Sequence, residues 1–134
     1  MKVDGGCHCG FITYEAEIDP EKVVICNCMD CQRLSGSAFR SVAFSVENGF
    51  KLLSGELKVY LKTGGSGNKR QQAFCSECGS SIYSTSEEGG PLYGIRTGSI
   101  NQCDQLTPTV RIFTRSEQPW IDQIPSMPKV GGAP

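Results

Sequence analysis

The chain contains few histidines and few aromatic residues. Among its 134 residues there are one histidine and one tryptophan, and aromatic residues make up 8%. With His8 as its only histidine, the chain cannot form a zinc finger that uses two cysteines and two histidines. The zinc deaminase pattern is also missing, because Cys9 and Gly10 follow His8 and no proline precedes Cys75. These absences exclude two common classes of zinc protein.

The sequence also lacks a strong charge of either sign and any long apolar run. Thirteen Lys and Arg residues against fourteen Asp and Glu give a net charge of −1, so no basic face for nucleic acid is expected. No stretch is long and apolar enough for a transmembrane helix, and no apolar segment follows Lys2 as in a secretory signal. We therefore expect a cytoplasmic protein with no nucleic-acid or membrane partner. A chain of this length predicts a single domain over residues 1–134.

Short stretches rich in β-branched and aromatic residues, separated by Gly, Ser, Asn and Pro, run through most of the chain. Alternation is clearest from Ile12 to Ile18, as in a half-buried strand. Strands are expected at residues 11–18, 23–25, 39–46, 50–53, 57–61, 71–74, 82–83, 92–97 and 110–114. Many short strands with frequent turn signals predict an all-β sandwich or barrel-like fold.

The regions between the strands give further expectations. Residues 54–56 read as a hairpin turn between two paired strands, and residues 62–69 as an exposed loop. Helix is expected only as a turn or two at residues 30–34, ended by Gly36. The core should cover about residues 3–125, followed by an extended tail over residues 126–134, with Trp120 and Ile121 holding the tail in place. The side chains expected to be largely buried are Ile12, Tyr14, Val24, Val42, Phe44, Leu57, Val59, Leu61, Ile82, Tyr83, Ile95, Ile112 and Trp120.

Seven of the eight cysteines lie in spacings typical of metal ligands. They are Cys7 and Cys9; Cys26, Cys28 and Cys31; and Cys75 and Cys78. Thiolates suit Zn²⁺, and short spacings let one turn of chain present two or three of them to one ion. Seven ligands divide into one closed site of four thiolates and one site of three with an open position. A closed zinc site is structural, whereas an open one can do chemistry.

Loop closure favours one division of these ligands. Cys26, Cys28 and Cys31 can converge on one ion at almost no entropic cost, which leaves the first and last pairs to share the other. That second site closes a loop of about 65 residues at a cost of a few kcal/mol, against roughly 10–16 kcal/mol from zinc binding. The alternative joins the N-terminal pairs and leaves Cys31 with the C-terminal pair. A framework of four disulfides is a further alternative, disfavoured by the C-x-C spacings.

His8 and Cys103 are left outside these groups. In an extended Cys7-His8-Cys9 segment, His8 points away from the ion that its neighbours bind, as a surface or second-layer histidine, with a ligand or catalytic base as the rival reading. Cys103 lies in a polar context without a neighbouring cysteine and is expected to be a free thiol. The rival is that Cys103 completes the three-cysteine site.

Five segments of the chain together form a recognisable pattern: Gly5-Gly6-Cys7-His8-Cys9-Gly10; Cys26 to Phe39 with its Cys-x-Cys-x-x-Cys-Gln-Arg-x-Ser-Gly-Ser-Ala-Phe pattern; Phe74-Cys75-x-x-Cys78-Gly79-Ser80; Thr97-Gly98-Ser99-Ile100; and Pro119-Trp120-Ile121. In these segments, over roughly residues 3–125, the chain resembles the glutathione-dependent formaldehyde-activating enzyme family, which includes the centromere protein V domain. One departure is Arg111, three residues after Pro108, where relatives commonly carry a histidine.

The resemblance implies a small zinc-stapled β fold of the Mss4-like type with two zinc ions per chain. It implies a structural zinc on Cys7, Cys9, Cys75 and Cys78 and a catalytic zinc on Cys26, Cys28 and Cys31. The family activity joins glutathione to formaldehyde to give S-(hydroxymethyl)glutathione, a carbon–sulfur lyase reaction in reverse. A thiol that enters the open site would lose its proton to the metal and then add to a small carbonyl. Arg33 is a candidate for the carboxylate of the thiol substrate, or else a solvated surface arginine.

Two other functions stay open from the sequence. The chain could be a binding or scaffold module in which both zinc ions are structural, or a redox or zinc sensor in which Cys26 to Cys31 oxidise and release metal. A pocket beside the three-cysteine group favours the enzyme. A flat surface, or a fourth protein ligand, favours the scaffold.

Overall fold

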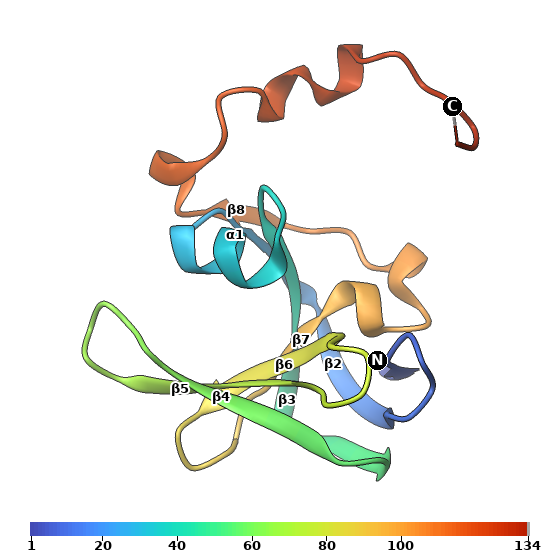
Figure 1. Ribbon diagram of the computed structural model, residues 1–134, viewed down its shortest axis with the longest axis vertical. Coiled ribbons are helices and arrows are strands. Elements are labelled where there is room, and N and C mark those ends of the chain that lie inside the picture. The colour runs from blue at the N-terminus through green and yellow to red at the C-terminus, as the bar shows by residue number, and fades with distance from the viewer. Residues whose placement is uncertain (134) are drawn as a thin grey trace.

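The computed structural model describes residues 1–133 and contains one bent sheet of eight strands (Figure 1). The strands are β1 (Lys2–Gly6), β2 (Thr13–Cys26), β3 (Arg40–Ser54), β4 (Leu57–Thr63), β5 (Lys69–Cys75), β6 (Ser81–Ser86), β7 (Gly94–Arg96) and β8 (Val110–Ile112). Hydrogen bonding orders seven of them β1-β2-β3-β7-β6-β5-β4, and β8 pairs in parallel with β2. The all-β prediction is confirmed.

Strands β2 and β3 are longer than the sequence suggested. The segments expected at residues 11–18 and 23–25 lie on one strand, β2, and those at 39–46 and 50–53 lie on β3. The register between β2 and β3 shifts on both sides of Ile18, so bulges interrupt the apolar alternation there. An interruption of this kind looks like a strand end in the sequence, which explains why each strand was expected as two pieces.

The predicted hairpin at residues 54–56 is wrong. Ser54 on β3 pairs with Thr13, whereas Leu57 on β4 pairs with Cys75, so the two strands joined by this turn do not pair with each other. Gly55 has a φ of +82°, and a Cβ there would lie 2.3 Å from the carbonyl oxygen of Phe11. The turn therefore carries the chain from one part of the sheet to another past a closely packed backbone.

The predicted helix and the predicted loop are both present. Helix α1 (Met29–Ser35) ends at Gly36, which adopts the left-handed conformation with a φ of 63°. Strands β4 and β5 form a hairpin and take up the two ends of the predicted loop, so the loop between them is residues 64–68. Short 3-10 helices follow at Thr97–Ser99, Cys103–Gln105, Thr114–Ser116 and Ile121–Ser126, the last two in the C-terminal segment that runs past α1 (Figure 1). None of the helices within residues 1–133 has the length and apolarity to cross a membrane.

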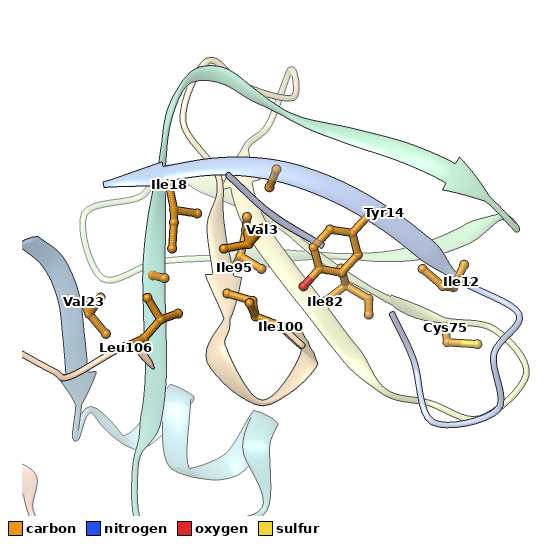
Figure 2. Packing of buried hydrophobic residues seen from close by; sticks show 12 residues of the cluster. Val3, Ile12, Tyr14, Ile18, Val23, Cys75, Ile82, Ile95, Ile100 and Leu106 are labelled. Atoms are coloured by element: carbon orange, nitrogen blue, oxygen red, sulfur yellow. The ribbon is translucent and has the colours of Figure 1, made fainter. Parts of the chain in front are cut away.

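The core lies on one face of β1, β2, β3, β6 and β7, where Tyr14, Ile82 and Ile95 are fully buried (Figure 2). Ile12 and Val42 are also buried, and Val24, Phe44, Leu57, Tyr83 and Ile112 are partly buried. The expectation of burial is wrong for Val59, Leu61 and Trp120, which are 44%, 42% and 41% exposed. The first two lie on β4, which bonds only to β5 at the sheet edge, and Trp120 lies beyond the last strand. The prediction of burial relied on the apolar character of these side chains, which does not determine whether other parts of the chain pack over them.

Candidate metal centres

The structure brings the first and last cysteine pairs together. The sulfur atoms of Cys7, Cys9, Cys75 and Cys78 all lie within 4.8 Å of one another. Cys7 Sγ and Cys9 Sγ are 3.6 Å apart, and Cys9 Sγ and Cys75 Sγ are 3.8 Å apart. A tetrahedral ion with Zn–S bonds of about 2.3 Å separates its sulfur ligands by about 3.8 Å. The spacing of these four thiols therefore fits a zinc ion.

Two backbone turns set the directions of these thiols. In the turn after β5, the N–H groups of Glu77 and Cys78 lie 3.4 and 3.5 Å from Cys75 Sγ, and Gly79 N–H donates to the Cys75 carbonyl. Gly79 has a φ of +80°, a conformation that glycine adopts without steric cost. In the N-terminal turn, Ile12 N–H donates to Cys7 Sγ at 3.2 Å. Donors aimed at sulfur stabilise the thiolate form that binds metal.

The second group contains three thiols. The sulfur atoms of Cys26, Cys28 and Cys31 lie within 4.8 Å of one another, at the end of β2 and the start of α1. Cys28 is the N-cap of α1, and its sulfur accepts the backbone N–H of Cys31 at 3.3 Å. Cys26 is buried, whereas Cys28 and Cys31 are partly exposed. Three soft ligands on one side leave room for a fourth donor from outside the chain.

Two polar residues, one between the ligands and one directly after the last ligand, anchor the three-thiol group. Asn27 is fully buried, and both its backbone N–H and its side-chain amide donate to the Ile112 carbonyl. Gln32 on α1 donates to the carbonyls of Asn27 and Ser116 at 2.8 and 2.9 Å. These bonds tie the ligand loop to β8 and to the C-terminal segment. Neither residue was expected to act at this site, although Gln32 lies inside the motif from Cys26 to Phe39.

Two buried arginines lie near this group and were also missed. Arg40 faces Cys26 across the β2–β3 pair, and Arg96 follows on β7. Burial, followed by the neighbouring positive charge of Arg40, lowers the pKa of Arg96 to about 9. Burial also raises the pKa of the Cys31 thiol to about 12, against the opposing influence of Arg40. One feature of the sequence indicated that Arg40 is buried: Arg40 alternates in phase with apolar Val42 and Phe44 along its strand.

The remaining residues singled out from the sequence lie elsewhere. Neither thiol group within residues 1–133 includes His8 or Cys103, and both side chains are exposed. Arg33 is exposed and borders a shallow hollow with Met29 and Trp120. Arg111, the departure from the family pattern expected from the sequence, pairs with Glu117 and with Asp122. The hydrogen bond that Arg111 donates to the Glu117 carboxylate raises the pKa of Arg111 further.

Comparison with solved structures supports the architecture. The chain superposes on the crystal structure of a Rhodobacter sphaeroides protein, a structural-genomics target, with a TM-score of 0.60 and 20% sequence identity. The match covers 81% of this chain and 98% of that protein, and at this identity it shows a shared fold.

Comparison with protein families gives a match to the model described as glutathione-dependent formaldehyde-activating enzyme, over residues 2–116. The matched region contains both thiol groups and every strand of the sheet. On this match, the chain belongs to the glutathione-dependent formaldehyde-activating enzyme family.

Proposed function

We propose that the protein is a zinc-dependent enzyme that joins a small thiol, such as glutathione, to formaldehyde or a similar small carbonyl. The observation that carries this proposal is the inequality of the two thiol groups, four ligands in one and three in the other. Family membership supports the same chemistry. The four-thiol group would hold a structural zinc, and Cys26, Cys28 and Cys31 would hold a catalytic one.

The reaction forms a carbon–sulfur bond. The thiol sulfur attacks the carbonyl carbon, the C=O π bond breaks, and the proton released by the thiol ends on the new hydroxyl group, which gives S-(hydroxymethyl)glutathione. When bound, zinc supplies deprotonation and positioning of the thiol. The chain itself contributes a fixed ligand loop, because Asn27 and Gln32 hold it against β8 and the C-terminal segment.

The surroundings of the three-thiol group support an enzyme over a scaffold. A hollow of about 270 Å³ lies beside α1, bounded by Leu34, Ser35 and Arg40. Leu34 and Ser35 follow Cys31 by three and four residues and so lie on the same side of the helix. A small molecule in this hollow would lie on the side of α1 that carries Cys31. Free thiols in this number also fit a reducing compartment, the cytoplasm expected from the sequence.

The experiment is an exchange measurement on metal-analysed protein. Metal content is determined by mass spectrometry, and the rate of adduct formation between ¹³C-formaldehyde and glutathione is followed by NMR exchange spectroscopy. We expect up to two zinc ions per chain and a rate above the uncatalysed reaction, lost in Cys28→Ser and kept in Cys103→Ser. A zinc-loaded protein that leaves the exchange rate unchanged would favour the scaffold, and reversible release of zinc on oxidation without catalysis would favour the sensor.

A further inference from the structure

Two arginine side chains are buried in the sheet without an acidic partner. Arg40 and Arg96 are each 7% exposed. Both donate to one atom, Gln72 Oε1, at 3.0 and 2.8 Å. Of the ion pairs formed within residues 1–133, none includes either arginine, and the Nε atoms of both are buried without a hydrogen-bond partner. Buried charges in proteins are normally paired, so these two guanidiniums call for an anion.

Both arginines face the same side of the sheet as the three-thiol group. Cys26 is opposite Arg40 in the β2–β3 register, and Val42 is opposite Arg96 in the β3–β7 register. Alternate residues of a strand share a face of the sheet, so Arg40 and Val42 lie on the same face. Directly opposed residues on paired strands also share a face, so Arg96 lies on that face too. In the view of Figure 1, β2, β3 and β7 are labelled below α1, the helix that carries Cys31.

The charge of the thiol group does not neutralise the pair. Three thiolates and one Zn²⁺ carry a net charge of about −1, whereas two guanidiniums carry about +2. With a pKa of about 9, Arg96 remains protonated at neutral pH. A positive charge is therefore left over in a region that excludes most water, and a bound anion would neutralise it.

An open space lies in front of the two guanidiniums. The hollow of about 270 Å³ beside α1 has Arg40, Arg96, Gly79 and Gly98 in its wall. A Cβ built on Gly79 or Gly98 would meet no atom within 4 Å, so the glycine side of the hollow is unobstructed. A second hollow, next to His8, shares Arg96 and Gly98 with the first. On the side of the first hollow formed by Gly79 and Gly98, no side chain would have to move for a ligand to reach an arginine.

We propose that Arg40 and Arg96 form a carboxylate-recognition site that holds an anionic small thiol beside Cys26, Cys28 and Cys31. A guanidinium presents parallel N–H donors that match a carboxylate, which makes the pair a specific anchor. This inference rests on the proposed function and deepens it, since glutathione carries two carboxylates. It assigns the anchoring role to the buried pair in place of Arg33, which lies beside Met29 and Trp120.

The test is calorimetric titration of zinc-loaded protein with S-methylglutathione, whose thiol is blocked, and with its dimethyl ester, which lacks the carboxylates. We expect the acid to bind and the ester to bind at least about tenfold more weakly. Arg96→Gln should weaken binding of the acid roughly 10- to 100-fold, as expected for lost hydrogen bonds between charged groups, and leave ester binding unchanged.

A second variant keeps the test valid if Arg96→Gln fails to fold. Gly98→Leu leaves both arginines in place, has open space for its side chain, and should reduce binding of the acid about tenfold or more by filling the hollow. Gly65→Leu is the matched control, because Gly65 also has open space and lies in the remote loop after β4. Its binding should equal that of the parent protein.

Equal binding of acid and ester would overturn the inference, and so would the absence of binding for both. Unchanged acid binding in Gly98→Leu, and in Arg96→Gln where that variant folds, would overturn it as well. Loss of acid binding in Arg33→Gln alone would also overturn it. Failure of the proposed function is seen separately. Carboxylate-dependent binding without catalysed exchange defeats only the enzyme, whereas exchange with an unchanged KM for glutathione in Gly98→Leu defeats only the anchor.

Discussion

The sulfur atoms of Cys9 and Cys75 lie 3.8 Å apart although 66 residues separate them in the chain. Cys75 is fully buried at the end of β5, next to the turn that follows β1 (Figure 2). Metal at this point would join the N-terminal turn to the β4–β5–β6 part of the sheet. Binding energy gained there would act as folding energy.

Replacement of Cys75 by serine should therefore destabilise the whole domain, whereas replacement of Cys28 should leave it folded with less metal. We expect Cys75→Ser to lose the cooperative thermal transition or to melt far below the parent protein. Cys28→Ser should keep a transition close to the parent and lose one zinc equivalent. Circular dichroism melts with metal analysis check both, and equal melting temperatures for the two variants would contradict the division of roles.

Chelation should remove the two ions in a fixed order. Zinc bound by Cys26, Cys28 and Cys31 would have three protein ligands and an open position, so a chelator could enter its coordination shell directly. Zinc on the four-thiol group should be released only as the fold opens. A colorimetric zinc indicator should report one fast equivalent and one slow equivalent, and the slow phase should accelerate in denaturant. A single phase for both ions would argue against unequal sites.

Replacement of Cys103 by serine should leave zinc affinity unchanged. Cys103 is exposed in the 3-10 helix Cys103–Gln105 and belongs to neither thiol group within the described residues. Competitive titration with a chelator of known affinity measures both sites in the variant. Loss of the labile zinc would mean that Cys103 closes the second site, which would remove the open position on which the enzyme proposal depends.

Replacement of Gln32 by alanine should cost about 1–3 kcal/mol of unfolding free energy, because it leaves the carbonyls of buried Asn27 and partly buried Ser116 without this donor. The same change should loosen the labile zinc, since Gln32 fixes the ligand loop. Denaturant titration and zinc affinity check the two effects. Gln105→Ala, at an exposed position, is the control and should alter neither measurement.

Truncation in the core should cost far more than truncation on the edge strand. Ile82 is fully buried, and Ile82→Ala should lower the unfolding free energy by about 2–5 kcal/mol. Leu61 on β4 is 42% exposed, and Leu61→Ala should cost clearly less because the side chain is already partly in water. Comparable losses from denaturant unfolding would show that β4 is covered in solution.

Some features of this protein follow from local sequence alone. Cys26, Cys28 and Cys31 lie within six residues, so almost any fold of that segment brings their thiols together. Gly36 ends α1 because glycine adopts the left-handed conformation without steric cost. The pairing of distant cysteines followed from counting ligands and comparing closure entropy with metal affinity, and the structure brings those four sulfur atoms together.

Other features were decided only by the tertiary structure. Ser54 and Leu57 are only three positions apart in sequence, yet they pair with Thr13 and Cys75, because strand partners are chosen by long-range packing and not by the turn between them. Alternation indicated that β4 has an apolar face, but only the structure shows that β4 is an edge strand on which Leu61 is 42% exposed. The burial of Arg40 and Arg96 against Gln72 depends on three strands meeting. The sequence pattern describes each strand separately, whereas burial and strand pairing depend on which other strands pack beside it.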